Sequence, residues 1–315
     1  IGNFDGVHLG HQAMLDKAKS LAKSQQLASM VMIFEPQPRE FFSPQNAPAR
    51  LTNLAEKTQL IAEHSIDSLI VANFDNDFRN LSAHDFATIL VKLNVKRLVL
   101  GDDFRFGHDR TGDSEFLRAF GLPVQILHTV TDHAHQDERV SSTRIRECLQ
   151  QGDLATAKHL LGRDYAITGM VEHGDKIGRT LDFPTANIAL NRIKPALHGI
   201  FAVSVTATDG TDLSTLGKNT QTGVQGLTKG SLFGACNVGT RPALKNKYGV
   251  EWRLEVNFPK FDGDLYGKEL TVTFLHFLHG EINYPSLDAL KQGIAQDVVD
   301  LLDWREQQAF AKSCP

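Results

Sequence analysis

The chain has 315 residues, long enough for two domains, and its 41% hydrophobic and 22% charged residues are typical of a soluble globular protein. The formal net charge of −4 argues against a general nucleic-acid binder but allows a local basic site. No apolar run reaches membrane-spanning length, so we expect no membrane partner, and no signal peptide is visible. The cysteines, Cys148, Cys236 and Cys314, are far apart, which favours a reducing, cytoplasmic location over a disulfide framework.

The chain opens on a glycine-bounded turn, GNFDGVHLGH over residues 2–11, that carries His8 and His11. Glycine lets backbone approach a ligand closely, and imidazoles at a helix start can donate to phosphate oxygens. Apolar residues at helical spacing predict a helix from near Leu9. A strand should precede the turn; since the chain begins at Ile1, we expect the natural N-terminus to be missing. Solvated histidines in an ordinary turn stay an alternative, and a zinc site is a weaker one.

The first half of the chain alternates predicted strands and helices. Short apolar runs predict strands over 28–34, 68–74, 97–101 and 124–130, and helical spacing predicts helices over 54–64 and 82–93. Ser82 is the expected cap of the second helix. This alternation predicts a doubly wound, Rossmann-like α/β domain, whose ligands bind beyond the carboxyl ends of the strands.

Two loops at those strand ends hold unusual residues. Residues 101–113 form a polar, glycine-rich loop that contains two phenylalanines and two arginines. Apolar side chains in such a loop are expected to pack against another group, which argues against a simple exposed loop. Residues 141–146, SSTRIR, place hydroxyls and arginines at the start of a helix, a suitable phosphate clamp. An ordinary capped helix with surface arginines is the alternative for this second segment.

The pattern changes after a connecting helix predicted over 151–162. Short strands predicted over 166–171, 199–206, 232–238, 252–258 and 269–278 indicate an all-β domain, a barrel of the Greek-key type. Residues 211–230 read as a long flexible loop, and an apolar stripe from Leu287 to Trp304 predicts a C-terminal helix packed on the barrel. We place the domains at residues 1–158 and 159–315.

A second phosphate site is predicted in the β domain over 169–187. Glycine-rich backbone can wrap phosphates, basic side chains can neutralise them, and a Thr hydroxyl with an Asn amide oxygen can ligate Mg²⁺. The residues of this site are Gly174, Lys176, Gly178, Arg179, Thr185 and Asn187. A glycine-rich hairpin is the alternative. Glu255, in a predicted strand, is a candidate general base for an alcohol, with Glu251 as a competitor.

Taken together, these motifs resemble the bacterial bifunctional riboflavin kinase / FMN adenylyltransferase (FAD synthetase) family. The resemblance covers essentially the whole chain, and the identity, order and spacing of the motifs make it specific. The motifs are GNFDGVHLGH (2–11), GDDFRFGHDRTGD (101–113), SSTRIR (141–146), GRTLDFPTAN (178–187), NVGTRP (237–242) and DGDLYGK (262–268).

The resemblance implies two ATP-dependent reactions, in which flavin is both substrate and product. The barrel would phosphorylate riboflavin to FMN, and the N-terminal domain would adenylylate FMN to FAD with release of pyrophosphate. His8 and His11 would serve the ATP phosphates, and Glu255 would accept the hydroxyl proton. The further residues it implies are Asn3, Asp5 and Gly6 in the nucleotide turn, Ser142, Thr143 and Arg144 opposite it, Phe104, Arg105 and Phe106 at the flavin, and Thr185 and Asn187 at Mg-ATP.

The chain departs from the family pattern at Asp182, Ala243, Lys260 and His279, where the family usually has Gly, Thr, Asp and Arg. Asp182 adds negative charge near a triphosphate. A monofunctional FAD synthetase with a weak kinase is therefore an alternative, and a non-catalytic flavin-binding protein is a more distant one. We expect no obligate protein partner.

Overall fold

We describe the protein from a computed structural model, which describes residues 1–128, 130–132, 138–173, 185–217, 229–242 and 250–313. The chain divides into two compact units, one of residues 1–145 with 160–162 and one of residues 146–159 with 163–315. Each unit is described by itself. Within the described ranges, no helix is both long and apolar enough to cross a membrane.

The elements of the first unit and the segment that follows it confirm the predicted alternation of strands and helices. In chain order they are α1 (Leu9–Ser24), β1 (Met30–Glu35), α2 (Pro38–Phe42), η1 (Pro44–Asn46), α3 (Leu54–Glu63), β2 (Ser68–Asn73), α4 (Asn76–Arg79), α5 (Ala83–Lys92), β3 (Leu98–Gly101), η2 (His108–Arg110), α6 (Ser114–Ala119), β4 (Val124–Leu127), β5 (Thr131–Asp132), β6 (Glu138–Arg139), α7 (Ser142–Gln150) and α8 (Leu154–Leu161).

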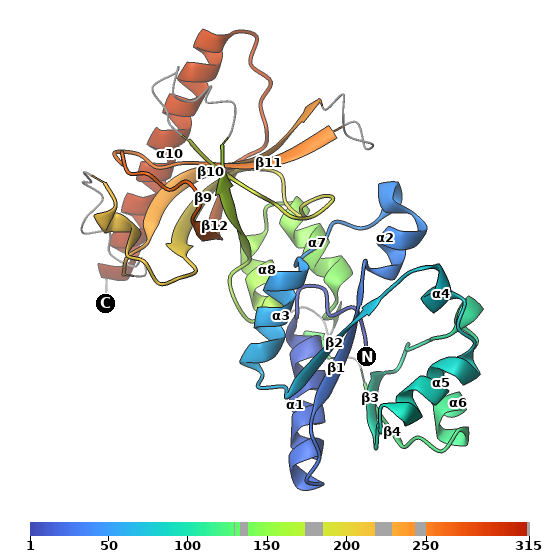
Figure 1. The fold of residues 1–315 in the computed structure, drawn as a ribbon. Helices are drawn as coiled ribbons and strands as arrows, with labels where there is room; N and C mark the ends of the chain where they lie inside the picture. The colour runs from blue at the N-terminus through green and yellow to red at the C-terminus, as the bar shows by residue number, and fades with distance from the viewer. Residues whose placement is uncertain (129, 133–137, 174–184, 218–228, 243–249, 314–315) are drawn as a thin grey trace. The chain divides into compact units, whose positions relative to one another are not determined.

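Alternate side chains of β1 face two different apolar layers, as expected of a doubly wound sheet. Val31 and Ile33 pack with residues of α1 and α3, whereas Met32 packs with residues of α5, β3 and α6. Figure 1 shows α1 and α3 beside the β1–β2 pair and α5 and α6 beside β3 and β4. The fold class predicted for this half is confirmed.

The parallel strands of the first unit form two pairs rather than one continuous sheet in the described residues. β1 pairs with β2 and β3 pairs with β4. A cavity of about 320 Å³, lined mainly by apolar side chains, lies between α1, the start of β1 and the start of β3. The turn of residues 2–11 lies instead near the carboxyl end of β1. The Asp5 carboxylate binds the backbone of Leu51 and Thr52, and the adjacent Arg50 binds Glu35, the last residue of β1.

The second unit is built on a closed antiparallel barrel with the strand order β10-β11-β8-β7-β12-β9 in the described residues. Its elements are β7 (Ala166–Glu172), β8 (Thr185–Ile188), β9 (Gly199–Ala207), η3 (Leu213–Thr215), β10 (Leu232–Pro242), β11 (Val250–Asn257), β12 (Glu269–His279) and α10 (Leu287–Ser313). The sequence predicted these strands except β8, because four residues after a glycine-rich stretch are too few to show alternation.

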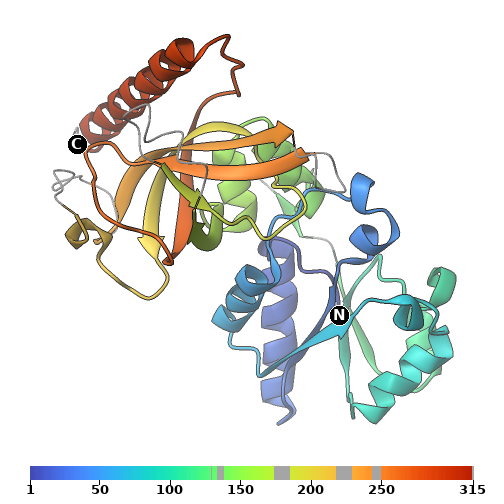
Figure 2. The same ribbon diagram turned by 45° about the horizontal axis from the view of Figure 1, so that its top comes forward.

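The C-terminal helix α10 lies along the outside of the barrel (Figure 2). Leu301 is fully buried against Ala202, Phe233 and Ala235, with Trp304 packed beside them, which confirms the predicted contact. The predicted stripe was too long, however, because Leu287 at its start is 65% exposed. Beyond Leu287, the stripe residues Leu290, Ile294 and Val298 are half-buried, and burial is complete at Leu301.

Candidate functional site

The two histidines of the opening turn stack on one another at the start of α1. Their ring centroids are 3.7 Å apart with an interplanar angle of 18°. The His8 Nδ1 caps the helix by accepting from the His11 backbone N–H at 3.4 Å, so the proton of neutral His8 lies on Nε2. A Cβ on Gly10 would lie 3.2 Å from the His8 ring, which explains the glycine between them. This end of α1 therefore combines imidazole donors with the helix N-terminus.

His11 is held in its neutral form. Burial, together with the charges of Lys57 and Arg139, keeps the pKa of His11 well below its usual range. The His11 Nδ1 is buried and has no hydrogen-bond partner among the described residues. An anion bound here would offset the positive surroundings and favour the protonated ring.

The turn owes its shape to a network beneath it. The Asp5 carboxylate accepts from the backbone N–H groups of Leu51 and Thr52 at 3.1 Å each, and the Gly6 N–H donates to the Thr52 hydroxyl at 3.0 Å. Gly6 has φ +81°, and a Cβ there would lie 2.7 Å from Leu51. Asp5 is 3% exposed, so its carboxylate has a structural role and holds the backbone of the turn in place. Asn3, by contrast, is exposed at the surface.

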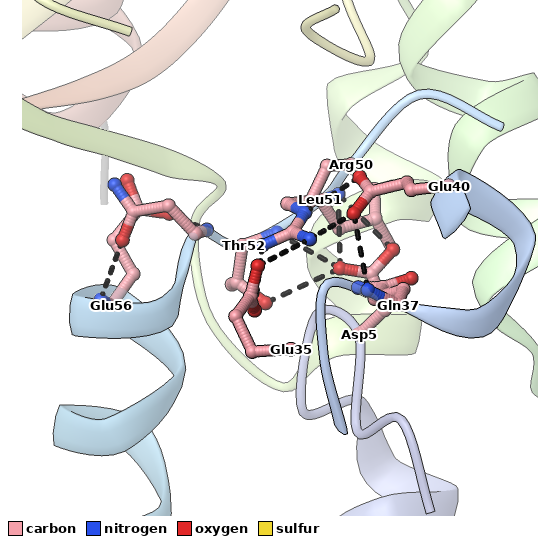
Figure 3. Close-up of polar contacts among 9 residues, drawn as sticks. Asp5, Glu35, Gln37, Glu40, Arg50, Leu51, Thr52 and Glu56 are labelled. Carbon is pink, nitrogen blue, oxygen red and sulfur yellow. Dashed lines mark hydrogen bonds and ion pairs between the residues drawn. The ribbon is translucent and has the colours of Figure 1, made fainter. Parts of the chain in front are cut away.

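Beside this network lies a buried ion cluster at the carboxyl end of β1 (Figure 3). The Arg50 guanidinium, 7% exposed, binds Glu35 at 2.9 and 3.0 Å and Glu40 at 2.8 Å, with a second contact to Glu40. The Gln37 backbone N–H also donates to Glu40, at 3.2 Å. The cluster fixes the 36–50 segment against the strand end, where ligands of doubly wound sheets bind.

The predicted clamp at the start of α7 reaches the same turn. The Ser142 hydroxyl donates to the Asp5 carbonyl oxygen at 2.9 Å, across 137 positions of sequence. Thr143 is exposed, and the Arg144 Nε lies 3.0 Å from Glu138. The structure thus brings His8, His11 and Ser142 into one region.

The phenylalanines of the 101–113 loop have different surroundings. Phe106 is 7% exposed in the apolar core and exchanges backbone hydrogen bonds with Gly112 at 2.9 and 3.0 Å. Phe104 is only partly buried and stacks on Phe106, with centroids 5.6 Å apart, while Arg105 is exposed. Phe104 and Arg105 can therefore reach a ligand, and Phe106 supports them from below.

In the barrel unit, the register aligns the predicted kinase residues in one row. Glu255 on β11 lies opposite Asn187 on β8 and Asn237 on β10, and Thr185 lies opposite Asn257. Because side chains alternate along strands, Thr185, Asn187 and Glu255 share one face, while the intervening Leu254 and Val256 are buried.

Glu255 and its competitor Glu251 flank Arg253 on the same face of β11. The Arg253 guanidinium lies 3.6 Å from Glu255 and 3.5 Å from Glu251. Glu251 is four positions further along the strand, roughly 13 Å from the Asn187 row. The register therefore favours Glu255 as the carboxylate that works with Thr185 and Asn187.

Gly174, Lys176, Gly178 and Arg179, and the departures Asp182 and Ala243, lie outside the described residues. The departure Lys260 is exposed, with φ +62°.

The remaining departure, His279, contacts a carboxylate of the C-terminal helix. Its Nε2 is 2.8 Å from Asp297 on α10, and its Nδ1 is 2.8 Å from the Gly280 carbonyl oxygen. The Gly280 carbonyl oxygen and the Asp297 carboxylate are both hydrogen-bond acceptors. The two ring nitrogens of His279 can donate to both only when the imidazole is protonated, unless the carboxylate carries the proton instead.

Comparison with known proteins identifies the family. The sequence profile of FAD synthetase matches residues 1–144, and that of riboflavin kinase matches residues 161–304. A bifunctional riboflavin kinase/FMN adenylyltransferase of Escherichia coli K12 is 41% identical over 300 residues, which cover 94% of this chain and 89% of that protein. The chain belongs to this bifunctional family. Its counterpart in Haemophilus influenzae is 40% identical over 305 residues, 95% of this chain and 91% of that protein.

A solved structure also matches along the whole chain. A protein of Streptococcus pneumoniae, described as a macrolide-efflux protein, shares 28% identity and a TM-score of 0.74 over 96% of this chain and 93% of its own. The resemblance inferred from the motifs is confirmed by the family match, and so is the enzymatic character that it implied.

Sequence reasoning missed the residues that support the turn from below. Lys57, Arg50 and Glu40 are all at most 7% exposed, although charged residues are rarely buried. One signal was available for Lys57: it lies three residues after Leu54 and four before Ile61, on the apolar face of α3. A charge on an apolar helix face indicates either a surface helix end or a buried cation.

Proposed function

We propose that the chain phosphorylates riboflavin to FMN in its barrel unit and adenylylates FMN to FAD in its N-terminal unit. The observation that carries the proposal is the family match over both units. Two groupings of residues support it: His8 and His11 with Ser142 at one turn, and Thr185, Asn187 and Glu255 on one face of the barrel. ATP is the co-substrate of both steps.

In the kinase step, the riboflavin 5′-hydroxyl oxygen bonds to the γ-phosphorus of ATP and the bond from that phosphorus to the β–γ bridging oxygen breaks. ADP leaves, and Glu255 accepts the hydroxyl proton. Thr185 and Asn187 offer a hydroxyl and an amide oxygen on the same face as Glu255, a donor set that suits Mg²⁺ bound together with ATP phosphates. The metal would neutralise phosphate charge in the transition state.

In the adenylyl step, a phosphate oxygen of FMN bonds to the α-phosphorus of ATP and pyrophosphate leaves. The nucleophile is already an anion, so the protein need not remove a proton; positioning and charge stabilisation suffice. His8 Nε2–H and His11 donate to the phosphates, Ser142, Thr143 and Arg144 approach from α7, and Asn3, Asp5 and Gly6 shape the turn. Phe104 and Arg105 contact the flavin, with Phe106 beneath them.

The experiment measures two products from two starting points. Wild type with ATP and Mg²⁺ should convert riboflavin to FMN and FAD, and FMN to FAD with pyrophosphate. Glu255→Gln should lower FMN formation by about 10²- to 10⁴-fold and spare FAD formation from FMN. Glu251→Gln is the matched control and should retain both activities.

His11→Ala should give the reverse pattern, with FAD formation lowered about 10²- to 10³-fold and the kinase intact. Absence of both products in wild type would refute the bifunctional proposal. FAD from FMN without FMN from riboflavin would leave the monofunctional alternative, which the His279–Asp297 pair in place of an arginine favours.

We also propose a cytoplasmic location and no obligate partner beyond the small-molecule substrates. Cys148 and Cys236 are buried free thiols, as is usual in a reducing compartment. Formation of FMN and FAD by the purified chain without any added protein would support the absence of an obligate partner.

A further inference from the structure

Lys57 is a buried cation that the steps above do not use. Its side chain is fully buried on α3, and its Nζ has no hydrogen-bond partner among the described residues. A buried ammonium without a hydrogen bond is costly, and burial lowers the pKa of Lys57. A methionine or leucine would pack there more favourably, so packing alone does not explain the lysine.

The charged groups around Lys57 belong to the network beneath the opening turn. They are Asp5, Glu35, Glu40 and Arg50. The carboxylate of Asp5 holds backbone N–H groups, and those of Glu35 and Glu40 hold Arg50 (Figure 3). Among these described groups, three carboxylates face two cations, a net charge of −1; without Lys57 it would be −2.

The same lysine lies close to the histidine turn. Ile61, one helical turn after Lys57, packs with Phe4 and Val7 of that turn. The charge of Lys57 acts on His11, as does that of Arg139 from β6, while the His8 ring stacks on the His11 ring. The charge of Lys57 thus acts both on a carboxylate-rich network and on His11, which is to bind the polyphosphate.

We propose that Lys57 is a positioning residue of the adenylyl-transfer site, whose buried ammonium offsets the carboxylates beneath the turn so that the ATP polyphosphate can bind above it. This inference rests on the proposed FMN adenylyltransferase activity. Lys57 acts through Asp5, which shapes the turn, and through the electrostatic potential at His11. A site with net charge −2 beneath it would repel a polyanion more strongly than one with −1.

The test compares Lys57→Met with Lys92→Met, which makes the same change at an exposed position of α5. Steady-state formation of FAD from FMN is measured against ATP concentration. For Lys57→Met we expect KM for ATP to rise about tenfold with a smaller change in kcat, whereas Lys92→Met and the riboflavin kinase reaction of both variants should match wild type. Methionine keeps the buried stem, so the fold should be retained.

A pH profile separates positioning from a merely structural role. Lys57 lowers the pKa of His11, so its removal should move the His11 inflection in kcat/KM to higher pH. Titration of labelled histidines by NMR assigns the inflection. A raised KM with an unmoved inflection would overturn the proposal.

Charge compensation supplies a second variant. Glu35→Gln removes one carboxylate from the network while keeping a hydrogen-bond acceptor for Arg50. In the Lys57→Met background it should bring KM back toward wild type. By itself it should lower KM for ATP, which keeps the proposal testable if Lys57→Met fails to fold; an unchanged or raised KM in Glu35→Gln overturns it.

Different outcomes would refute the proposed activity and the role of Lys57. No FAD from FMN and ATP in wild type would refute the proposed activity, whatever the variants do. FAD formation in wild type together with identical KM, kcat and pH profile in Lys57→Met would refute only the role of Lys57.

Discussion

Replacing Arg50 with methionine should selectively destabilise the N-terminal unit. Arg50 is 7% exposed and is the shared partner of Glu35 and Glu40 (Figure 3). Methionine keeps the apolar stem in place and removes the guanidinium. The substitution therefore leaves a buried carboxylate with the Gln37 N–H but without its cation.

The two carboxylates contribute unequally to the expected loss. Glu40 is 7% exposed, so losing a charge about 4 Å away costs about 4 kcal/mol at an effective dielectric constant near 20. Glu35 is 28% exposed and can be hydrated again, so it contributes little. We expect a loss of about 3–5 kcal/mol, the usual cost of removing one partner of a buried ion pair.

The distribution of aromatic residues makes the assay selective. Both tryptophans and all four tyrosines lie in the barrel unit, within residues 163–315. Urea unfolding followed by tryptophan fluorescence therefore reports that unit alone, whereas far-ultraviolet circular dichroism reports both. Arg50→Met should move a circular-dichroism transition by about 2 M, for a slope near 2 kcal/mol per M, and leave the fluorescence transition in place.

Two control variants decide whether the reasoning holds. Arg118→Met breaks an exposed pair with Glu115 in the same unit and should cost less than about 1 kcal/mol. Adding Glu40→Gln to Arg50→Met should recover at least half of the lost stability, because the stranded charge is gone. A loss from Arg50→Met no larger than that from Arg118→Met, or no recovery in the double variant, would refute the argument.

Further predictions concern the rest of the chain. Burial lowers the pKa of His279, but hydrogen bonds to a backbone carbonyl and to Asp297 raise it above 6.5 overall. The protonated His279–Asp297 pair therefore stabilises the barrel unit fully below pH 6.5, and this stabilisation is lost as the pH rises through the pKa of His279 in the folded protein. Fluorescence-detected unfolding should show that decline, and an equal decline in His279→Gln would contradict it. Gly112→Ala places a Cβ 2.5 Å from the Phe106 ring and should cost about 1–3 kcal/mol by circular dichroism; an unchanged midpoint would count against overpacking. Burial raises the pKa of the Cys236 thiol well above its usual range, so iodoacetamide should label Cys236 only after unfolding. Mass spectrometry of the Cys236 peptide separates it from Cys148 and Cys314, and fast labelling of Cys236 in the native protein would disprove this.

Local pattern was sufficient for most of the fold. The apolar spacing after Leu9 and the cap at Ser82 predicted α1 and α5 with correct starts, because these signals act within one helical turn. The change from helical to alternating pattern predicted a barrel after the connecting helix. Strand β8 was not predicted, because its four residues after a glycine-rich stretch are too few to show an alternating pattern.

The sequence by itself determined which side chains could serve phosphate chemistry: His8, His11 and Ser142 stand in recognisable motifs, and Glu255 is a carboxylate in a predicted strand. Only the tertiary structure decided how they are held. The Ser142–Asp5 contact spans 137 positions, and the Glu255–Asn187 register depends on strand pairing, so neither leaves a local signal. Arg50, Glu40 and Lys57 read as ordinary surface charges until the fold buries them, because the cost of burying a charge depends on neighbours that are distant in sequence.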